Sequence, residues 1–184
     1  GEIRYRGYPI EELIGNVGFA DMVWLMTRGE LPTRPQATLL EAALMSAVDH
    51  GPQAPSIAIA RMAVTCGSSL NNAMASAVNV LDDVHGGAGE QAVELYRSIQ
   101  ERQAGGADLA TAVQEGIAEW QRSRTKIIPG FGHRFHPVDP RGPRLLQLVE
   151  EAAGRGEVEG GFVAIAREVE RQLIAMKGKL IPLN

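Results

Sequence analysis

Apolar side chains recur at three- and four-residue steps along most of the chain, which is the spacing of one face of an α-helix. Alternating apolar and polar positions, which are typical of half-buried strands, are almost absent. The pattern therefore predicts an all-α fold. Five stretches carry it most plainly, and the helices that they predict cover residues 21–26, 36–48, 70–81, 109–120 and 162–176.

Residues that start and stop helices flank several of these stretches. Asp21, Ser69 and Asp108 stand at the beginning of an apolar stripe, where a short oxygen-bearing side chain can accept a hydrogen bond from the first turn. Gly29 and Pro32 follow the first predicted helix in the order that commonly ends one. The last two stripes are predicted to be core helices, and the alanine-rich stripe of residues 70–81 is predicted to pack closely against other helices.

One segment between the predicted helices cannot lie inside a helix. Residues 127–132 contain Pro129, which lacks a backbone donor, and two glycines, which favour open backbone angles. A loop is predicted there. The candidate strands are limited to residues 3–8 and 180–183.

The composition is that of a folded globular protein. Of the 184 residues, 45% are hydrophobic and 22% are charged, a balance that argues against disorder. The net charge of −4 provides no basic field of the kind that attracts nucleic acid or an anionic membrane surface. The sequence therefore predicts neither a nucleic-acid partner nor a membrane partner.

Cys66 is the only cysteine, which excludes an internal disulfide and favours a reducing compartment, so a cytoplasmic location is predicted. No apolar run approaches the ~20 residues of a membrane-spanning helix. The chain begins at Gly1 without a methionine and stops on an apolar stretch, and we therefore expect residues to be missing at both ends.

Three of the four histidines, His50, His85 and His133, stand beside a glycine in contexts that break helices. A glycine neighbour leaves the imidazole and the adjacent backbone amides open to a ligand. Histidine also exchanges protons near neutral pH. One such histidine is more often a structural cap than a catalyst, but three together predict a functional site.

Arg134 and Arg141 stand near His133 in a run that two prolines stiffen. Guanidinium groups suit carboxylates and phosphates, which predicts an anion-binding role. The alternative is that both arginines form surface ion pairs, for instance with Asp139, that contribute at most ~1 kcal/mol. The residues alone leave both interpretations open.

Four motifs stand in order along the chain and together resemble the citrate synthase and citryl-CoA lyase family. They read E-I-R-Y-R-G-Y-P-I-E-E-L at residues 2–13, G-E-L-P at 29–32, H-G-G-A at 85–88, and G-F-G-H-R at 130–134 with D-P-R at 139–141. The resemblance implies a mostly α-helical fold, in which a large and a small domain close over the substrates of a homodimer. Residues 1–184 are expected to be one citrate synthase-like domain, incomplete at its C-terminal end, with small-domain elements at about residues 86–184.

The resemblance also implies catalytic and substrate-binding roles. His85 matches the family's histidine that hydrogen-bonds the thioester oxygen and stabilises the enol of acetyl-CoA. His133 matches the histidine that polarises the oxaloacetate carbonyl and exchanges a proton with the citryl hydroxyl. His50 and Arg141 match the residues that hold the carboxylates of oxaloacetate or citrate.

A coenzyme A thioester is the implied substrate, and no metal is expected. Gly130, Phe131 and Gly132 would let the CoA moiety lie against backbone, and Arg134 would contact a phosphate.

The first histidine motif departs from common bacterial citrate synthases, which read D-H-x-x-N-A-S. Gln53 and Pro55 replace the asparagine and serine, and only about seventeen residues separate Pro32 from His50. D-H-G-P with this short spacing looks more like the citryl-CoA lyase module of ATP-citrate lyase, so cleavage of citryl-CoA is the leading hypothesis. That module has lost the histidine that this chain keeps as His85, and citrate synthase therefore remains the alternative.

The family's catalytic aspartate, in a motif like N-V-D-G, follows a segment that resembles residues 179–184, and this chain stops before it.

Two further hypotheses come from other classes of protein. A catalytically inactive relative would bind CoA or citrate as a sensor. A structural helical scaffold would bind neither.

Overall fold

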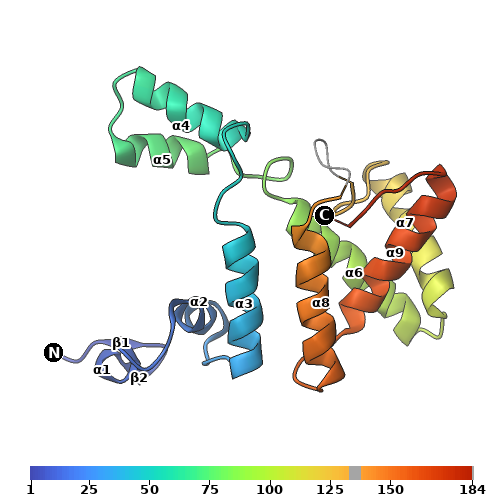
Figure 1. Ribbon diagram of the computed structural model, residues 1–184, viewed down its shortest axis with the longest axis horizontal. Coiled ribbons are helices and arrows are strands. Elements are labelled where there is room, and N and C mark those ends of the chain that lie inside the picture. The colour runs from blue at the N-terminus through green and yellow to red at the C-terminus, as the bar shows by residue number, and fades with distance from the viewer. Residues whose placement is uncertain (133–137, 184) are drawn as a thin grey trace. The chain divides into compact units, whose positions relative to one another are not determined.

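The computed structural model describes residues 1–132 and 138–183. These residues form nine helices and one two-stranded sheet, which confirms the all-α prediction (Figure 1). The chain divides into two units. The first unit comprises residues 1–48 and 143–160, and the second unit comprises residues 49–142 and 161–184.

The first unit opens with a small hairpin in place of the single strand predicted at residues 3–8. Strand β1 (Arg4–Tyr5) pairs antiparallel with β2 (Tyr8–Pro9), and Tyr5 lies opposite Tyr8. Arg6 and Gly7 both have positive φ angles, of 50° and 92°, as a tight two-residue hairpin turn requires. The predicted strand therefore folds back on itself at Gly7.

Helices α1 (Ile10–Leu13), α2 (Phe19–Arg28) and α3 (Arg34–Ser46) follow the hairpin. The carboxylate of Asp21 accepts a hydrogen bond from the backbone N–H of Gly18 at 2.8 Å, so it closes the first turn of α2 from inside the helix. Thr33 and Gln36 form a reciprocal capping box at the start of α3. The buried apolar residues of this part are Leu13, Ala20, Leu25 and Ala37.

The second unit contains α4 (Pro55–Thr65), α5 (Leu70–Val78), α6 (Ala88–Ala104), α7 (Leu109–Ser123) and α9 (Gly161–Lys177). Helices α4 and α5 form a hairpin, while α6, α7 and α9 pack on one another (Figure 1). α7 and α9 are core helices, as predicted. One hydrophobic core joins them, made of Leu95, Ile99, Ala112, Val113, Ile117, Trp120, Ile128, Phe131, Ile165, Val169 and Leu173.

Four helices were not predicted: α1, α4, α6 and α8 (Arg141–Gly154). In α6 the buried stripe of Ala92, Leu95 and Ile99 has helical spacing, but polar and charged residues dominate the rest of the helix.

The prediction of a strand at residues 180–183 was wrong, because only an isolated bridge between Phe131 and Leu183 forms there. Among the described residues, no helix is both long and apolar enough to cross a membrane.

The alanine-rich stripe of residues 70–81 is only partly a packed helix. The helix ends at Val78, and Ala73 packs inward at 2% exposure. Leu70, Met74 and Val78 stay between 60% and 74% exposed. The apolar face that the stripe predicts is therefore present but is not covered within the described chain.

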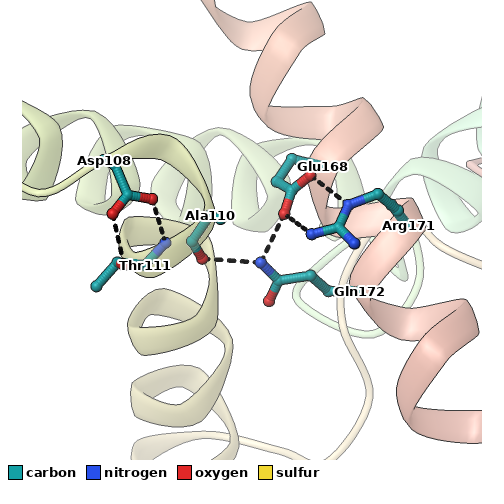
Figure 2. Close-up of polar contacts among 6 residues, drawn as sticks. All are labelled: Asp108, Ala110, Thr111, Glu168, Arg171 and Gln172. Atoms are coloured by element: carbon teal, nitrogen blue, oxygen red, sulfur yellow. Dashed lines mark hydrogen bonds and ion pairs between the residues drawn. The ribbon is translucent and has the colours of Figure 1, made fainter.

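A side-chain hydrogen bond from Gln172 to Ala110 ties α7 to α9 (Figure 2). Asp108 caps α7, because its carboxylate accepts from the backbone N–H of Thr111 at 3.0 Å and from its hydroxyl at 2.8 Å. Gln172 of α9 donates to the carbonyl of Ala110 at 2.8 Å and to Glu168 at 2.8 Å. The start of α7 is thus held against the side of α9.

Gly116→Ala is expected to lower the free energy of unfolding by ~1–2 kcal/mol, because overpacking of a rigid core outweighs the better helix propensity of alanine. A Cβ at Gly116 would lie 2.6 Å from Cγ1 of Ile99, which is fully buried and cannot move aside. Urea unfolding measures the change. Gly89→Ala is the control, because its Cβ meets nothing within 4 Å, and an equal loss in both variants would contradict the packing explanation.

Glu168→Gln is expected to destabilise the protein at pH 7 by up to ~1 kcal/mol, because its ion pair with Arg171 is partly exposed. The hydrogen bond from Arg171 lowers the pKa of Glu168 in the folded state. The stabilisation is therefore complete above the pKa that Glu168 has in the unfolded chain. It is lost as the pH falls through the lower pKa that Glu168 has in the folded protein.

Urea unfolding of the unchanged protein and of Glu168→Gln, each at pH 7 and at pH 3, tests this pH dependence. The difference in unfolding free energy should shrink at pH 3, whereas the exposed Glu41→Gln should show no such trend. A Glu168→Gln difference that is the same at both pH values would refute the assignment.

Candidate active site

His85 stands on a tight turn directly before α6. The backbone N–H of Asp82 donates to the carbonyl of His85 at 2.9 Å, and Asp82 and Gly86 form an isolated bridge. Gly86 has a φ of 113°, which side-chain-bearing residues rarely adopt. A Cβ at Gly87 would lie 2.7 Å from the carbonyl oxygen of Asp83. The two glycines after His85 are therefore required by the turn that presents the imidazole.

The imidazole of His85 meets the start of α4. Its Nε2 lies 2.9 Å from Oγ of Ser56 and 3.3 Å from the backbone nitrogen of Ser56, whose N–H donates to it. A backbone N–H can only donate, so Nε2 is the acceptor, and in the neutral ring the proton lies on Nδ1. The contact therefore leaves Nδ1–H as the hydrogen-bond donor that a ligand can use.

Ser56 was not predicted as a site residue. It lies 29 residues from His85 in the sequence and follows Pro55, which starts α4. The pair of Pro55 and Ser56 signals a helix start, but only the folded chain brings that helix to His85.

A pocket of about 330 Å³ lies beside the start of α6. The predicted loop forms one side of it through Gly130, Phe131 and Gly132, and Leu183 forms another. The indole N–H of Trp120 donates to the carbonyl of Ile127 at 3.2 Å and anchors the entry to this loop. The remaining lining residues are Ala88, Gly89, Ala92, Tyr96 and Ile127.

Backbone and aromatic groups line this pocket. Two of the three loop residues are glycines, so backbone faces the space. Burial raises the pKa of Tyr96 to about 12, so its hydroxyl stays protonated at neutral pH. The ring of Tyr96 packs at a tilt on Phe162, with centroids 5.7 Å apart. The pocket can therefore accept a flat group against uncharged walls, with the N-terminus of α6 beside it.

Arg141 is held by a buried carboxylate. Asp139, at 2% exposure, accepts from the Arg141 backbone N–H at 2.9 Å, from Nε at 2.9 Å and from Nη2 at 2.6 Å. The hydrogen bonds that Arg141 donates to Asp139 raise the pKa of Arg141 above its usual value. The ion pair between Arg141 and Asp139, which the sequence left as an alternative, therefore exists. The Arg141 side chain remains 41% exposed, so the pair is compatible with binding an anion as well.

Of the other predicted site residues, His50, His133 and Arg134, only His50 lies within the described residues. His50 is exposed between α3 and α4, and within residues 1–132 and 138–183 no hydrogen bond or ion pair joins it to His85 or Arg141. His133 and Arg134 lie outside the described residues. No three histidine, cysteine, aspartate or glutamate side chains gather as metal ligands in the part of the chain that the structure describes.

Comparison with known proteins gives the family. The model of the citrate synthase C-terminal domain matches residues 1–46 and 34–182, which is nearly the whole chain. The chain belongs to the citrate synthase family. The all-α fold and the order of the motifs, with His85 on its glycine turn, agree with this assignment.

Relatives with different activities resemble the chain. Citryl-CoA lyase from Hydrogenobacter thermophilus superimposes with a TM-score of 0.81 at 35% identity, over 100% of this chain and 67% of that one. ATP citrate lyase from Methanothrix soehngenii, solved in complex with citrate and coenzyme A, gives a TM-score of 0.76 at 25% identity, over 97% of this chain and 27% of that one. Citrate synthase from Acidithiobacillus ferridurans is 29% identical over 93% of this chain. The chain spans 42% of the length of that synthase.

Proposed function

We propose that the full-length protein is a citryl-CoA lyase, which cleaves citryl-CoA to acetyl-CoA and oxaloacetate. The observation that carries the proposal is the likeness to the Hydrogenobacter thermophilus citryl-CoA lyase over the whole chain. His50-Gly51-Pro52 and the short path from Pro32 to His50, which resemble a lyase module, point the same way.

In this mechanism His85 stabilises the charge that forms as the carbon-carbon bond breaks. Electrons from the broken bond move into the acetyl group, and the thioester oxygen becomes an enolate oxygen. Nδ1–H of His85 would donate to that oxygen, because Ser56 occupies Nε2. A donor fixed at a developing oxyanion contributes ~3–4 kcal/mol.

Proton transfers complete the reaction. By resemblance, His133 takes the proton of the tertiary hydroxyl of citryl-CoA as that carbon becomes the carbonyl of oxaloacetate. The family's aspartate, which follows the segment resembling residues 179–184, would protonate the acetyl carbon. These proton transfers require no metal ion.

The pocket of Gly130, Phe131 and Gly132 is proposed to hold part of the CoA moiety. Its backbone-lined wall and its place beside the turn of His85 suit a thioester that reaches from the pocket to Nδ1. The Methanothrix soehngenii lyase, to which this chain is similar, was solved with citrate and coenzyme A. Arg134 would contact a phosphate, while Arg141 and His50 would bind carboxylates.

The lyase and the synthase differ in what happens to the thioester. A synthase must also hydrolyse citryl-CoA and therefore needs a water molecule aimed at the thioester, whereas a lyase gains by excluding it. Gln53 and Pro55, which replace the asparagine and serine of the synthase pattern, change the groups beside the substrate.

The test supplies the full-length protein with acetyl-CoA and oxaloacetate and follows free CoA with a thiol reagent. Slow or absent release of CoA is the expected result. Release at rates typical of a synthase, ~10 per second or more, would replace the lyase proposal with citrate synthase.

The full-length protein is also proposed to be a homodimer, organised as a large and a small domain with small-domain elements at about residues 86–184. The exposed face of α5, made of Leu70, Met74 and Val78, is the surface that a second copy would cover. A cytoplasmic location stays a prediction from the single Cys66.

Sedimentation of the full-length protein at micromolar concentration is expected to show a dimer, and Met74→Glu should shift it to a monomer because a charge cannot be buried unpaired. Glu94→Gln, an exposed change outside this face, is the control. A stable monomer for the unchanged protein would contradict the proposal.

A further inference from the structure

The backbone of residues 181–183 lies against the loop of residues 130–132 in the second unit. The N–H of Gly132 donates to the carbonyl of Pro182 at 2.7 Å, and Phe131 and Leu183 form an antiparallel bridge. Leu183 also lines the pocket of about 330 Å³. The position of this short segment therefore sets one wall of the pocket.

One carboxylate of α9 holds the end of this segment. The backbone N–H of Leu183 donates to Oε1 of Glu170 at 3.0 Å, while Oε2 of Glu170 lies 3.9 Å from Nη1 of Arg167. The Glu170 side chain is 22% exposed, so water competes only partly for this bond. Hydrogen bonds to a charged acceptor are also stronger than those between neutral groups.

Residues 181–183 also pack closely against Gly142 and Gly132. A Cβ at Gly142 would lie 3.0 Å from the carbonyl oxygen of Leu183, so the start of α8 approaches the segment closely. A Cβ at Gly132 would lie 3.4 Å from Cγ2 of Ile181. The bond to Glu170 therefore adds a side-chain contact to a segment that already lies close to the backbone at Gly132 and Gly142.

We infer that Glu170 is a positioning residue for the pocket, which acts by fixing Leu183 against the loop of residues 130–132. The identity of the ligand, a CoA thioester, rests on the proposed function, whereas the role of Glu170 in fixing Leu183 is independent of that function.

The experiment compares Glu170→Ala, Glu170→Gln and Glu168→Ala in the full-length protein. Glu170→Ala removes the acceptor, and we expect the amide of Leu183 to exchange with solvent at least ~10-fold faster and the Kd for CoA to rise ~10-fold. The KM for citryl-CoA should rise with it, while kcat stays within ~3-fold because no reacting atom is touched. Glu170→Gln keeps an oxygen acceptor without the charge and should restore most of the amide protection and of the CoA affinity.

Glu168→Ala is the matched control. It removes another α9 glutamate that pairs with an arginine three residues away, but Glu168 bonds to Gln172 and Arg171, whereas Leu183 bonds to Glu170. If Glu168→Ala weakens CoA binding as much as Glu170→Ala, or if Leu183 exchanges at its original rate in Glu170→Ala, the inference is wrong. If the unchanged protein binds no CoA, the proposed function fails, and the exchange at Leu183 still decides the role of Glu170.

Discussion

Replacing His85 by alanine in the full-length protein is expected to lower the turnover number ~100-fold or more, because the enolate oxygen loses its fixed donor. Citrate binding should change little, since in the proposed mechanism His85 faces the thioester and not the carboxylates. Steady-state kinetics with citryl-CoA measures the first effect, and calorimetry with citrate measures the second. A variant within threefold of the unchanged protein would remove His85 from the mechanism.

Ser56→Ala provides a graded control for this result. It keeps the imidazole and the backbone N–H of residue 56, but it removes the hydroxyl 2.9 Å from Nε2. We expect a loss of ~10-fold in turnover, smaller than that of His85→Ala, because one of two contacts that orient the ring remains. An effect of Ser56→Ala equal to that of His85→Ala would show that Ser56 does more than orient the ring.

Replacing Arg141 by leucine is expected to raise the Kd for citrate ~10- to 100-fold, because a charge-assisted hydrogen bond to a carboxylate is worth ~1.5–3 kcal/mol. Asp139 fixes the guanidinium through Nε and Nη2, so the cation is oriented before a ligand arrives. Asp139→Asn should weaken citrate binding less, since the arginine keeps its charge but loses its ionic partner.

Arg155→Leu is the matched control for Arg141→Leu. Arg155 also pairs with an acidic residue two positions away, Glu157, but that carboxylate is 31% exposed while that of Asp139 is 3% exposed. Citrate affinity should be unchanged in Arg155→Leu. Calorimetry that gives unchanged citrate affinity for Arg141→Leu as well would reject a carboxylate-binding role for Arg141.

The sequence predicted those features that depend on near neighbours. Ser69 and Asp108 occupy the N-cap positions of α5 and α7, because the start of a helix is decided within one helical turn. The Asp108 side chain accepts the expected capping hydrogen bond, whereas the Ser69 side chain makes no such bond to the backbone of α5. The loop of residues 127–132 follows from its own proline and glycines. Most residues of the apolar stripes of α7 and α9 are buried because their spacing matches the helix, although Met176 at the end of the α9 stripe is exposed.

Features that depend on distant residues were not predicted. The contact of Ser56 with His85 joins residues 29 positions apart, and the bond from Leu183 to Glu170 depends on how α9 and the segment after it pack. Asp139 was predicted as a possible ion-pair partner, but its burial is a property of the fold. Periodicity describes one element at a time and cannot show which elements meet.

The products formed from (3S)-citryl-CoA test the central claim most directly. The full-length protein is incubated with this thioester, and the products are identified by mass spectrometry, with malate dehydrogenase and NADH as an independent readout of oxaloacetate. The account predicts acetyl-CoA and oxaloacetate in equal amounts, with little free CoA. Citrate and free CoA as the main products, or citryl-CoA left unchanged, would contradict it and would favour a synthase or a non-catalytic relative, respectively.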